Sequence, residues 1–479
     1  MQLHDLTALE VATAVRDRQA TAVEVADHAL RRAVDLGPAF GAFVTVTADL
    51  ALAQARALDD RLARGEAGGM PLLGVPCPIK DLNPVAGVGW ELGSAALRGT
   101  VAEVDDDIVG WLRGAGTVMV GKTSTPEFGL PCYTEPEGAA PARTPWDSTR
   151  SAGGSSGGAA AAVAARIVPL AHGSDGGGSI RIPASACGLV GLKVSRGRIS
   201  PGRLREPGPG LATDGVLSRT VRDTAVALDV LAGPRPGDTY YAPPLDGTFL
   251  GACERDPGPL RVGLLTVPVI AADAPVHPSC VRAAEQTAQL LESLGHQVEP
   301  APVPFPAERW QAFQALWAVG ALSVPLGPGQ EPALRPLTRW LREQGRAVTG
   351  LAHAQALAAV QRLTREVAGV WDGFDVILTP TLAQPPALIG QLRNDDDPAA
   401  DFAAQTRFTP WTSVSNLTGR PAISLPLHTA SVDGVELPIG VMLGGSFGRE
   451  DLLLAVAAAL EAAVGGFSGP AATKLPSGA

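Results

Sequence analysis

Two glycine-rich segments of the sequence carry serine hydroxyls that could take part in acyl transfer. Residues 151–158 read Ser-Ala-Gly-Gly-Ser-Ser-Gly-Gly, and residues 173–179 read Gly-Ser-Asp-Gly-Gly-Gly-Ser. Glycine lets backbone N–H groups approach a ligand closely, which suits either a phosphate cradle or an oxyanion hole. Because Gly176-Gly177-Gly178 directly precedes Ser179, we take Ser179 as the candidate nucleophile. Taken alone, such a cluster is most often an ordinary flexible turn.

Lys80 is a candidate base for this serine. It lies in residues 74–81, which read Gly-Val-Pro-Cys-Pro-Ile-Lys-Asp, in a chain where arginine is the usual cation and lysine is rare. An apolar setting disfavours the charged ammonium and so lowers the pKa of a lysine. A neutral lysine can act as a general base. The alternative is a surface lysine whose stem covers apolar neighbours.

The elements that must position these residues alternate between helix and strand. Thr21-Ala22-Val23-Glu24 has the form of a capping box and predicts the start of a helix. Strands are expected at 42–46, 117–120, 167–171, 260–265 and 374–378, and helices at 281–294 and 450–464. This alternation predicts an α/β fold.

Composition excludes several classes of protein. The chain has 479 residues, of which 46% are hydrophobic and 18% charged, so it has ample material for a large core. A net charge of −10 with scattered basic residues argues against nucleic acid as a partner. No apolar stretch is long enough to span a membrane and no export signal is apparent, so we expect a cytoplasmic protein. Five widely spaced cysteines and dispersed histidines predict reduced thiols and no metal site.

The segment from Gly74 to Lys193 resembles the amidase signature family. The resemblance rests on Lys80, on residues 153–158 and on the run Asp-Gly-Gly-Gly-Ser-Ile-Arg-Ile-Pro at 175–183, and it extends to residues 416–426 and 438–441. It implies a triad in which Ser179 attacks a carbonyl, Ser155 relays the proton and Lys80 is the base. It also implies an oxyanion hole from the N–H groups of residues 176–179, an acyl-enzyme and no cofactor.

The same resemblance implies features that support the triad. The Gly154–Ser155 peptide bond is expected to be cis, which is rare outside proline. Ser156 is expected to orient the relay, and Asp175 is expected to form a salt bridge with Arg181 beside the nucleophile.

The chain departs from the family pattern at two positions. Gly176 stands where the family usually has threonine, serine or isoleucine, and Val194 stands where it usually has proline. We expect the first departure to loosen the oxyanion loop and the second to change only the exit of a strand.

Substrate selection is expected to come from residues outside the signature. Trp310, Phe313 and Trp317 fall at helical spacing and either line an apolar pocket or belong to a helix core. Cys132, Tyr133 and Thr134 are also expected in the pocket. Three short runs, 134–137, 196–202 and 235–239, resemble family members that hydrolyse the cyclic dimer of 6-aminohexanoate, an oligomer of nylon. This favours small apolar linear, cyclic or aryl amides, while carbamates (a urethanase) and esters would need the same nucleophile and stay open.

Residues 116–123 suggest a different function, because they match the nucleotide-binding pattern GxxxxGK[ST]. That pattern requires a flexible loop between the glycines, whereas Thr117-Val118-Met119-Val120 reads as a strand. We therefore disfavour a nucleotide-binding protein.

A second rival is a glutamine-hydrolysing amidotransferase subunit of the same family, which would need a clamp for the charges of glutamine. Four arginines at helical spacing could supply one, and exposed surface positions are the alternative: Arg335, Arg339, Arg342 and Arg346.

The predicted organisation is one α/β domain over 1–479, with a mixed twisted sheet surrounded by helices. The signature core is expected at 70–200, and a region that shapes the substrate site is expected at 240–400. We expect a small-molecule amide or carbamate as the partner, and a monomer or homodimer.

Overall fold

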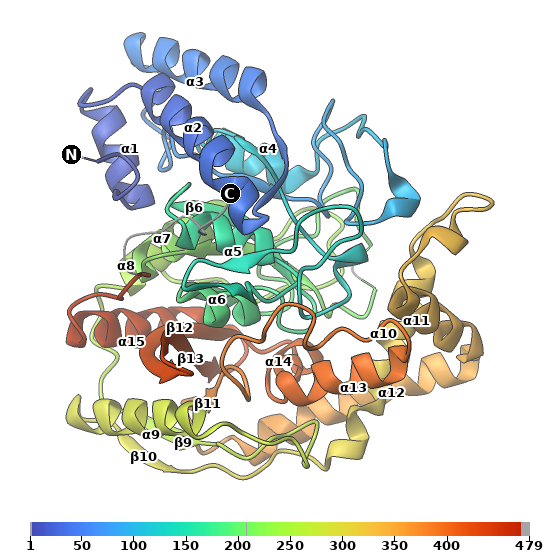
Figure 1. Ribbon diagram of the computed structural model, residues 1–479. Coiled ribbons are helices and arrows are strands. Elements are labelled where there is room, and N and C mark those ends of the chain that lie inside the picture. The colour runs from blue at the N-terminus through green and yellow to red at the C-terminus, as the bar shows by residue number, and fades with distance from the viewer. Residues whose placement is uncertain (1, 207, 471–479) are drawn as a thin grey trace.

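One mixed β-sheet of eight strands forms the centre of the molecule (Figure 1). The computed structural model describes residues 2–206 and 208–470, so residues 1, 207 and 471–479 of the expected 1–479 domain lie outside the described residues. The strand order is β10-β9-β11-β13-β12-β7-β8-β6. The bounds are β6 (Leu170–Asp175), β7 (Val190–Lys193), β8 (Thr213–Ser218), β9 (Arg261–Leu264), β10 (Gln297–Pro300), β11 (Val376–Pro380), β12 (Ala422–Val432) and β13 (Val435–Gly445). The predicted α/β fold with a mixed sheet is confirmed.

Strand direction divides the sheet into two parts. β10, β9 and β11 run parallel, and the other neighbouring pairs are antiparallel. β12 and β13 form a hairpin whose two loop residues, Asp433 and Gly434, both have positive φ. A two-residue turn of this kind matches the twist of the flanking strands, which explains the Asp-Gly pair at this position.

Helices cover both faces of the sheet. On β13, a Cβ at Gly440 would meet Ser185 of α6 (Arg181–Cys187), and a Cβ at Gly445 would meet Leu453 of α15 (Glu450–Ala463). Positions five apart on a strand point to opposite faces, so α6 and α15 pack on opposite sides. Three further helices pack on the strands: α5 (Gly157–Ala164), α7 (Val221–Leu231) and α9 (Pro278–Ser293).

A small second sheet, in the order β1-β3-β2, carries Lys80. Its strands are β1 (Phe43–Val46), β2 (Ile79–Lys80) and β3 (Gly121–Thr123). The strand expected at 117–120 is wrong, because only Val118 in that stretch bridges a neighbouring segment and regular pairing begins at Gly121. Two further short strands, β4 (Arg143–Thr144) and β5 (Asp147–Ser151), form a separate two-stranded sheet.

The N-terminal helices lie together at one end of the molecule, in blue in Figure 1. They are α1 (Ala8–Arg16), α2 (Ala22–Phe40) and α3 (Ala48–Ala63), with α4 (Asp107–Gly114) nearby. The predicted capping box is confirmed: the hydroxyl of Thr21 accepts from the N–H of Glu24, whose carboxylate accepts from the N–H of Thr21.

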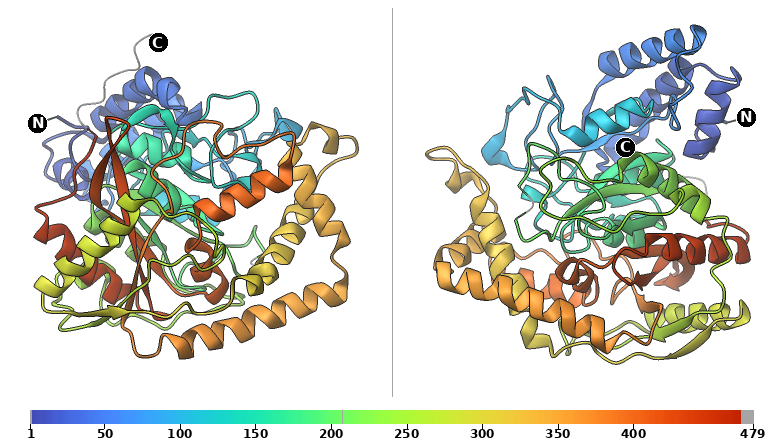
Figure 2. Two further views of the ribbon diagram at one scale, coloured as in Figure 1. Left: turned by 60° about the horizontal axis from the view of Figure 1, so that its bottom comes forward. Right: turned by 180° about the vertical axis from the view of Figure 1, so that it is seen from behind.

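The expected substrate-shaping region contributes a group of helices at the side of the molecule (Figure 2). These are α10 (Gln311–Ser323), α11 (Pro336–Ala347) and α12 (Gly350–Val370). Two helices that follow these in the chain pack against them: α13 (Pro398–Phe408) and α14 (Thr412–Thr418). The short α8 (Phe249–Ala252) lies elsewhere and packs on α7 and α15. α10 packs on α11 and α12, α11 packs on α13, and α12 packs on α14. Within residues 2–206 and 208–470, no helix has both the length and the apolarity needed to cross a membrane.

Candidate active site

Lys80 ends β2 and is completely buried. Its Nζ lies 2.8 Å from Oγ of Ser155 and 3.0 Å from Oγ of Ser174. Burial lowers the pKa of Lys80 to about 7, although the charges of Asp175 and Asp214 oppose the shift. The amine can therefore be neutral, and able to accept a proton, near neutral pH.

Ser155 and Ser156 occupy the turn that leads into α5. The Gly154–Ser155 peptide bond is cis, as predicted. Gly154 has no room for a side chain, because a Cβ there would lie 2.7 Å from the backbone nitrogen of Tyr133. Ser156 joins the neighbouring segments: its hydroxyl donates to the carbonyl of Ser174, and its N–H donates to the carbonyl of Ser179.

Ser179 follows the glycine loop that connects β6 to α6, and 7% of it is exposed. The N–H groups of residues 177–179 donate to no other residue in the described parts of the chain. Gly178 has φ of 138°, and a Cβ there would lie 2.6 Å from both Ile182 and Thr412, so only glycine fits. The loop therefore holds a nearly buried hydroxyl beside N–H donors that have no protein acceptor.

A buried ion pair fixes the two ends of this loop. Nε and Nη2 of Arg181 donate to the two carboxylate oxygens of Asp175 at 3.0 and 2.9 Å, so the predicted salt bridge is confirmed. Burial would raise the pKa of Asp175, but the charge and hydrogen bonds of Arg181 and the amide of Asn416 lower it to about 2. Asn416 and Thr412, both on α14, also accept from Arg181, and the Thr412 hydroxyl donates to the carbonyl of Gly177.

No hydrogen bond joins the hydroxyls of Ser179 and Ser155 among the described contacts. The hydrogen bond from the Ser156 N–H to the Ser179 carbonyl, 3.2 Å long, instead ties the two serine segments together. Catalytic hydrogen bonds are often long without substrate and tighten when it binds.

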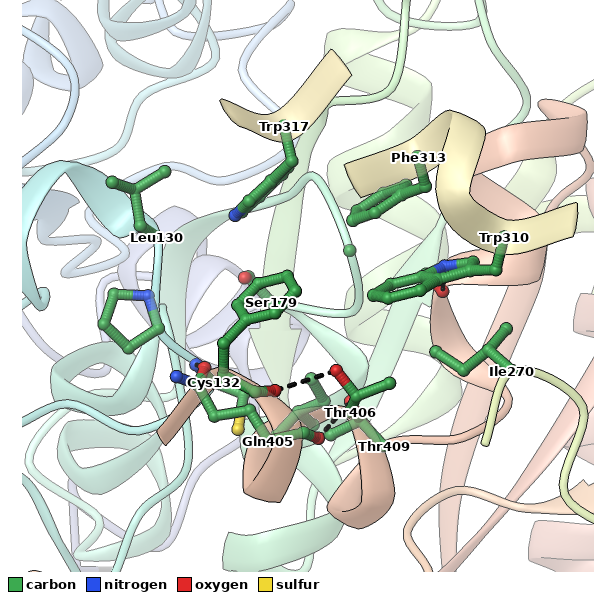
Figure 3. A pocket seen from close by; sticks show the side chains of 15 residues that line it. Leu130, Cys132, Ser179, Ile270, Trp310, Phe313, Trp317, Gln405, Thr406 and Thr409 are labelled. Carbon is green, nitrogen blue, oxygen red and sulfur yellow. Dashed lines mark hydrogen bonds between the residues drawn. The ribbon is translucent and has the colours of Figure 1, made fainter. Parts of the chain in front are cut away.

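Ser179 opens into a cavity with an aromatic wall (Figure 3). Trp310, Phe313 and Trp317 stack in a row, with ring centroids 5.1 and 5.2 Å apart. The row lies against the glycine loop, because a Cβ at Gly176 would be 3.2 Å from Trp317 and one at Gly177 would be 3.4 Å from Phe313. None of the described lining residues carries a charge.

Of the three other residues expected in the pocket, one lines the cavity and two do not. Cys132 lines the cavity. Tyr133 and Thr134 do not line it: the hydroxyl of Tyr133 donates to Asp401, and that of Thr134 donates to the carbonyl of Gly153. Both side chains are buried, so their placement in the pocket is corrected.

A second wall of the cavity was missed from the sequence. It comes from one face of α13 and the residue that follows it: Phe402, Gln405, Thr406 and Thr409. Their spacing of three and four residues is typical of a helix face and could have signalled a helix. Nothing in the sequence indicated that this face meets Ser179, since the contact joins segments more than 200 residues apart.

The nucleotide-binding reading of residues 116–123 does not fit the structure. Lys122 is completely buried, and its Nζ lies 2.6 Å from a carboxylate oxygen of Asp81. The segment continues into β3 rather than into a helix. The lysine that would contact phosphate is therefore already paired.

The arginine cluster does not form a clamp in the cavity. Arg335 and Arg342 are buried and pair with Asp395 and Glu331, so the surface reading is wrong for these two. Arg342 lies on α11 and Arg335 directly precedes it, and none of the four arginines lines the cavity.

The fold and the site define an amide hydrolase. The chain belongs to the Amidase family, whose profile matches residues 24–454. The family resemblance inferred from sequence is therefore confirmed.

Individual relatives support this assignment. The chain is 37% identical over 419 residues to 6-aminohexanoate-cyclic-dimer hydrolase of Paenarthrobacter ureafaciens, covering 82% of this chain and 84% of that protein. The structure of 6-aminohexanoate cyclic dimer hydrolase complexed with substrate superposes with a TM-score of 0.88 at 33% identity, covering 100% of this chain and 99% of the other. A bacterial aryl acylamidase of the amidase signature family superposes with a TM-score of 0.84 at 28% identity, covering 97% of each chain.

Proposed function

We propose that this amidase hydrolyses neutral amides with an apolar or aromatic group, with Ser179 as nucleophile, Ser155 as relay and Lys80 as base. The observation that carries the proposal is the cavity itself. Ser179 opens into an uncharged space with an aromatic wall, and a lysine with a lowered pKa lies 2.8 Å from the relay hydroxyl. A polar reaction centre within an apolar pocket is the usual form of a small-molecule site.

The proposed reaction begins when Oγ of Ser179 attacks the amide carbonyl. The Ser179 proton passes to Ser155, whose own proton passes to Nζ of Lys80. The oxyanion accepts hydrogen bonds from the loop N–H groups of residues 176–179, which have few competing acceptors. When the C–N bond breaks, the leaving amine takes the proton back through Ser155.

The second half of the proposed reaction releases the acid. Water attacks the acyl group on Ser179, and its proton follows the same route to Lys80. Collapse of the second intermediate returns a proton to Ser179 and frees the carboxylic acid. No cofactor is needed for either half.

The chemistry of the walls supports the proposed substrate class. Aromatic rings gain free energy by covering apolar groups and have no charge with which to bind an ion. The α-amino and carboxylate groups of glutamine would be desolvated in this cavity without a partner, which disfavours the amidotransferase alternative. Two relatives are named for a cyclic amide dimer and for aryl amides, which agrees with a neutral substrate.

A substrate panel tests the proposal. Purified protein is assayed with 4-nitroacetanilide, an aliphatic amide, 6-aminohexanoate cyclic dimer, an aryl carbamate, an aryl ester and glutamine. We expect hydrolysis of the anilide and the cyclic dimer and none of glutamine. The carbamate and ester rates decide whether the chain is also a urethanase or an esterase.

Matched variants test the residue roles. Ser179→Ala should lower kcat roughly ten-thousandfold or more, and Lys80→Met should lower it about a hundredfold or more. Ser185→Ala removes a buried hydroxyl from α6, the helix that follows Ser179, and should retain activity, because among the described residues that hydroxyl bonds only with the N–H of Gly440. Full activity in Ser179→Ala, or glutamine as the best substrate, would refute the proposal.

A further inference from the structure

A second cavity lies at the opposite end of α14 from the candidate active site. Its volume is about 440 Å³, which is within the usual range for small-molecule sites. It is bordered by the C-terminal part of α12 and the residues after it, the C-terminal end of α14, the residues just before β12 and just after β13, and loop residues 196 and 240–241. The lining includes three aromatic side chains that matter here: Tyr240, Trp371 and Phe447.

Arg420 lines this cavity as a buried cation without an anion. Six arginines in the described parts of the chain are at least nine-tenths buried: Arg150, Arg181, Arg198, Arg335, Arg342 and Arg420. The first five each form a salt bridge with a carboxylate. Arg420 forms none with any described residue. Removing an unpaired charge from water is costly, and an anion bound in the cavity would offset that cost.

The hydrogen bonds of Arg420 leave part of its guanidinium free. Nε donates to the carbonyl of Gly445 at 2.9 Å, and Nη2 donates to the hydroxyl of Ser446 at 3.2 Å. Nη1 donates to no described residue. The guanidinium also lies 5.9 Å from the ring centroid of Trp371, so the cation stands beside an aromatic surface.

Arg196 provides a second cation on the same cavity. Its Nε donates to the carbonyl of Gly210, and its Nη2 donates to the carbonyls of Asn416 and Leu417. Its Nη1 is also without a described acceptor, and the guanidinium lies 5.5 Å from the ring of Tyr240. Backbone carbonyls orient both arginines, but neither is neutralised by a carboxylate.

One acidic residue, Asp372, borders the cavity. It is exposed and forms no salt bridge with Arg196 or Arg420 among the described contacts. It therefore leaves the two cations available.

We propose that this cavity binds a small carboxylate joined to an aromatic or apolar body. The free Nη1 groups of Arg420 and Arg196, with the hydroxyl of Ser446, would hold the carboxylate oxygens. Trp371, Tyr240 and Phe447 would cover the apolar body. An inorganic anion would leave these aromatic side chains uncovered, so we expect the cavity to bind it more weakly than a carboxylate with an apolar body.

Isothermal titration calorimetry on the full chain tests the proposal with 3-phenylpropionate, 3-phenylpropanol and inorganic phosphate. We expect 3-phenylpropionate to bind, and both the uncharged alcohol and phosphate to bind at least about tenfold more weakly, since each lacks one half of the recognition. Arg420→Gln should weaken binding of the carboxylate about tenfold or more. Phe447→Ala, at an exposed position, should weaken it several-fold through lost apolar contact.

Two controls locate the binding. Arg449→Gln removes a neighbouring arginine that is exposed and paired with Asp451 outside the cavity, and it should leave binding unchanged. Phe313→Ala alters the Ser179 cavity and should also leave it unchanged. The proposal is overturned if 3-phenylpropionate fails to bind, if phosphate or the alcohol binds as tightly, or if binding survives in both Arg420→Gln and Phe447→Ala.

Discussion

Lys80 shows how a single residue acquires its chemistry from its surroundings. Its side chain is removed from water, while its hydrogen-bond partners, the hydroxyls of Ser155 and Ser174, are uncharged. The neutral form of the amine is therefore favoured, and the pKa of Lys80 falls from 10.5 to about 7. A base with a pKa near the working pH is well suited to proton transfer.

The activity is therefore expected to depend on pH with a defined sign. Below pH 7 the Lys80 amine is protonated and cannot accept a proton, so kcat/KM for 4-nitroacetanilide should rise as the pH increases through about 7 and then level off. The measurement is the initial rate at low substrate concentration between pH 5.5 and 9 (about 3.5 units around the pKa). A profile that is flat or falls over this range would contradict the role of Lys80.

The role of Gly176 also depends on a neighbouring residue, Trp317. The sequence led us to expect a looser loop at this position. The structure instead shows Trp317 against the open side of Gly176, at 3.2 Å from an added Cβ. The absence of a side chain makes room for the aromatic wall.

Gly176→Ser is expected to push Trp317 into the cavity. The narrower space should raise KM for an aryl amide by about five- to tenfold, because overpacking a close contact is costly. KM for acetamide, which does not reach the wall, should change little. The double variant Gly176→Ser/Trp317→Leu should recover part of the loss, and independent effects of the two changes would contradict the contact.

At the scale of elements, α14 and α6 hold the nucleophile loop together. Asp175 ends β6, Arg181 begins α6, and Thr412 and Asn416 of α14 complete their hydrogen bonds. The ion pair is fully buried, so loss of one charge leaves the other without a partner.

Asp175→Asn should therefore reduce the free energy of unfolding by about 3–5 kcal/mol, measured by urea denaturation. Glu66→Gln is the matched control, because it breaks an exposed pair with Arg64 and should cause no measurable loss. Equal stability of the two variants would show that the buried pair does not hold the loop.

The sequence predicted those parts of the site that lie in continuous segments. Lys80, Ser155 and Ser179 stand in glycine- or proline-rich runs whose residue types suggest their chemistry. The α13 wall and the contacts of Asn416 could not be predicted, because they join segments far apart in the chain. The burial of Arg335 and Arg342 could not be predicted either. Their spacing is that of a surface helix face, yet both are buried and pair with partly exposed carboxylates outside α11, Asp395 and Glu331.

The fold, like the site, could be predicted from the sequence only in part. The sequence pattern predicted three strands of the large sheet to within a few residues, namely β6, β9 and β11, and it missed strands such as β8 and β10. The strand expected at 117–120 failed because an apolar, β-branched run is equally suited to a buried extended segment without regular pairing.

At the scale of the whole molecule, the chain builds its site from two sources. The large sheet and the glycine loop after β6 position Ser179, the turn before α5 positions Ser155, and the small sheet positions Lys80, while α13 and the helical segment of residues 307–323 supply much of the cavity wall. A change in those helices can therefore alter the substrate without altering the reaction centre.

The uncharged lining has a consequence for the response to ionic strength. Raising sodium chloride from about 0.01 M to about 0.1 M shortens the Debye length from about 30 Å to about 10 Å. The KM of a neutral anilide should stay constant over this range, because neither the anilide nor the cavity wall offers a charge to be screened. An anilide with a carboxylate tail should instead bind better as salt is added, since screening weakens its repulsion by a protein of net charge −10.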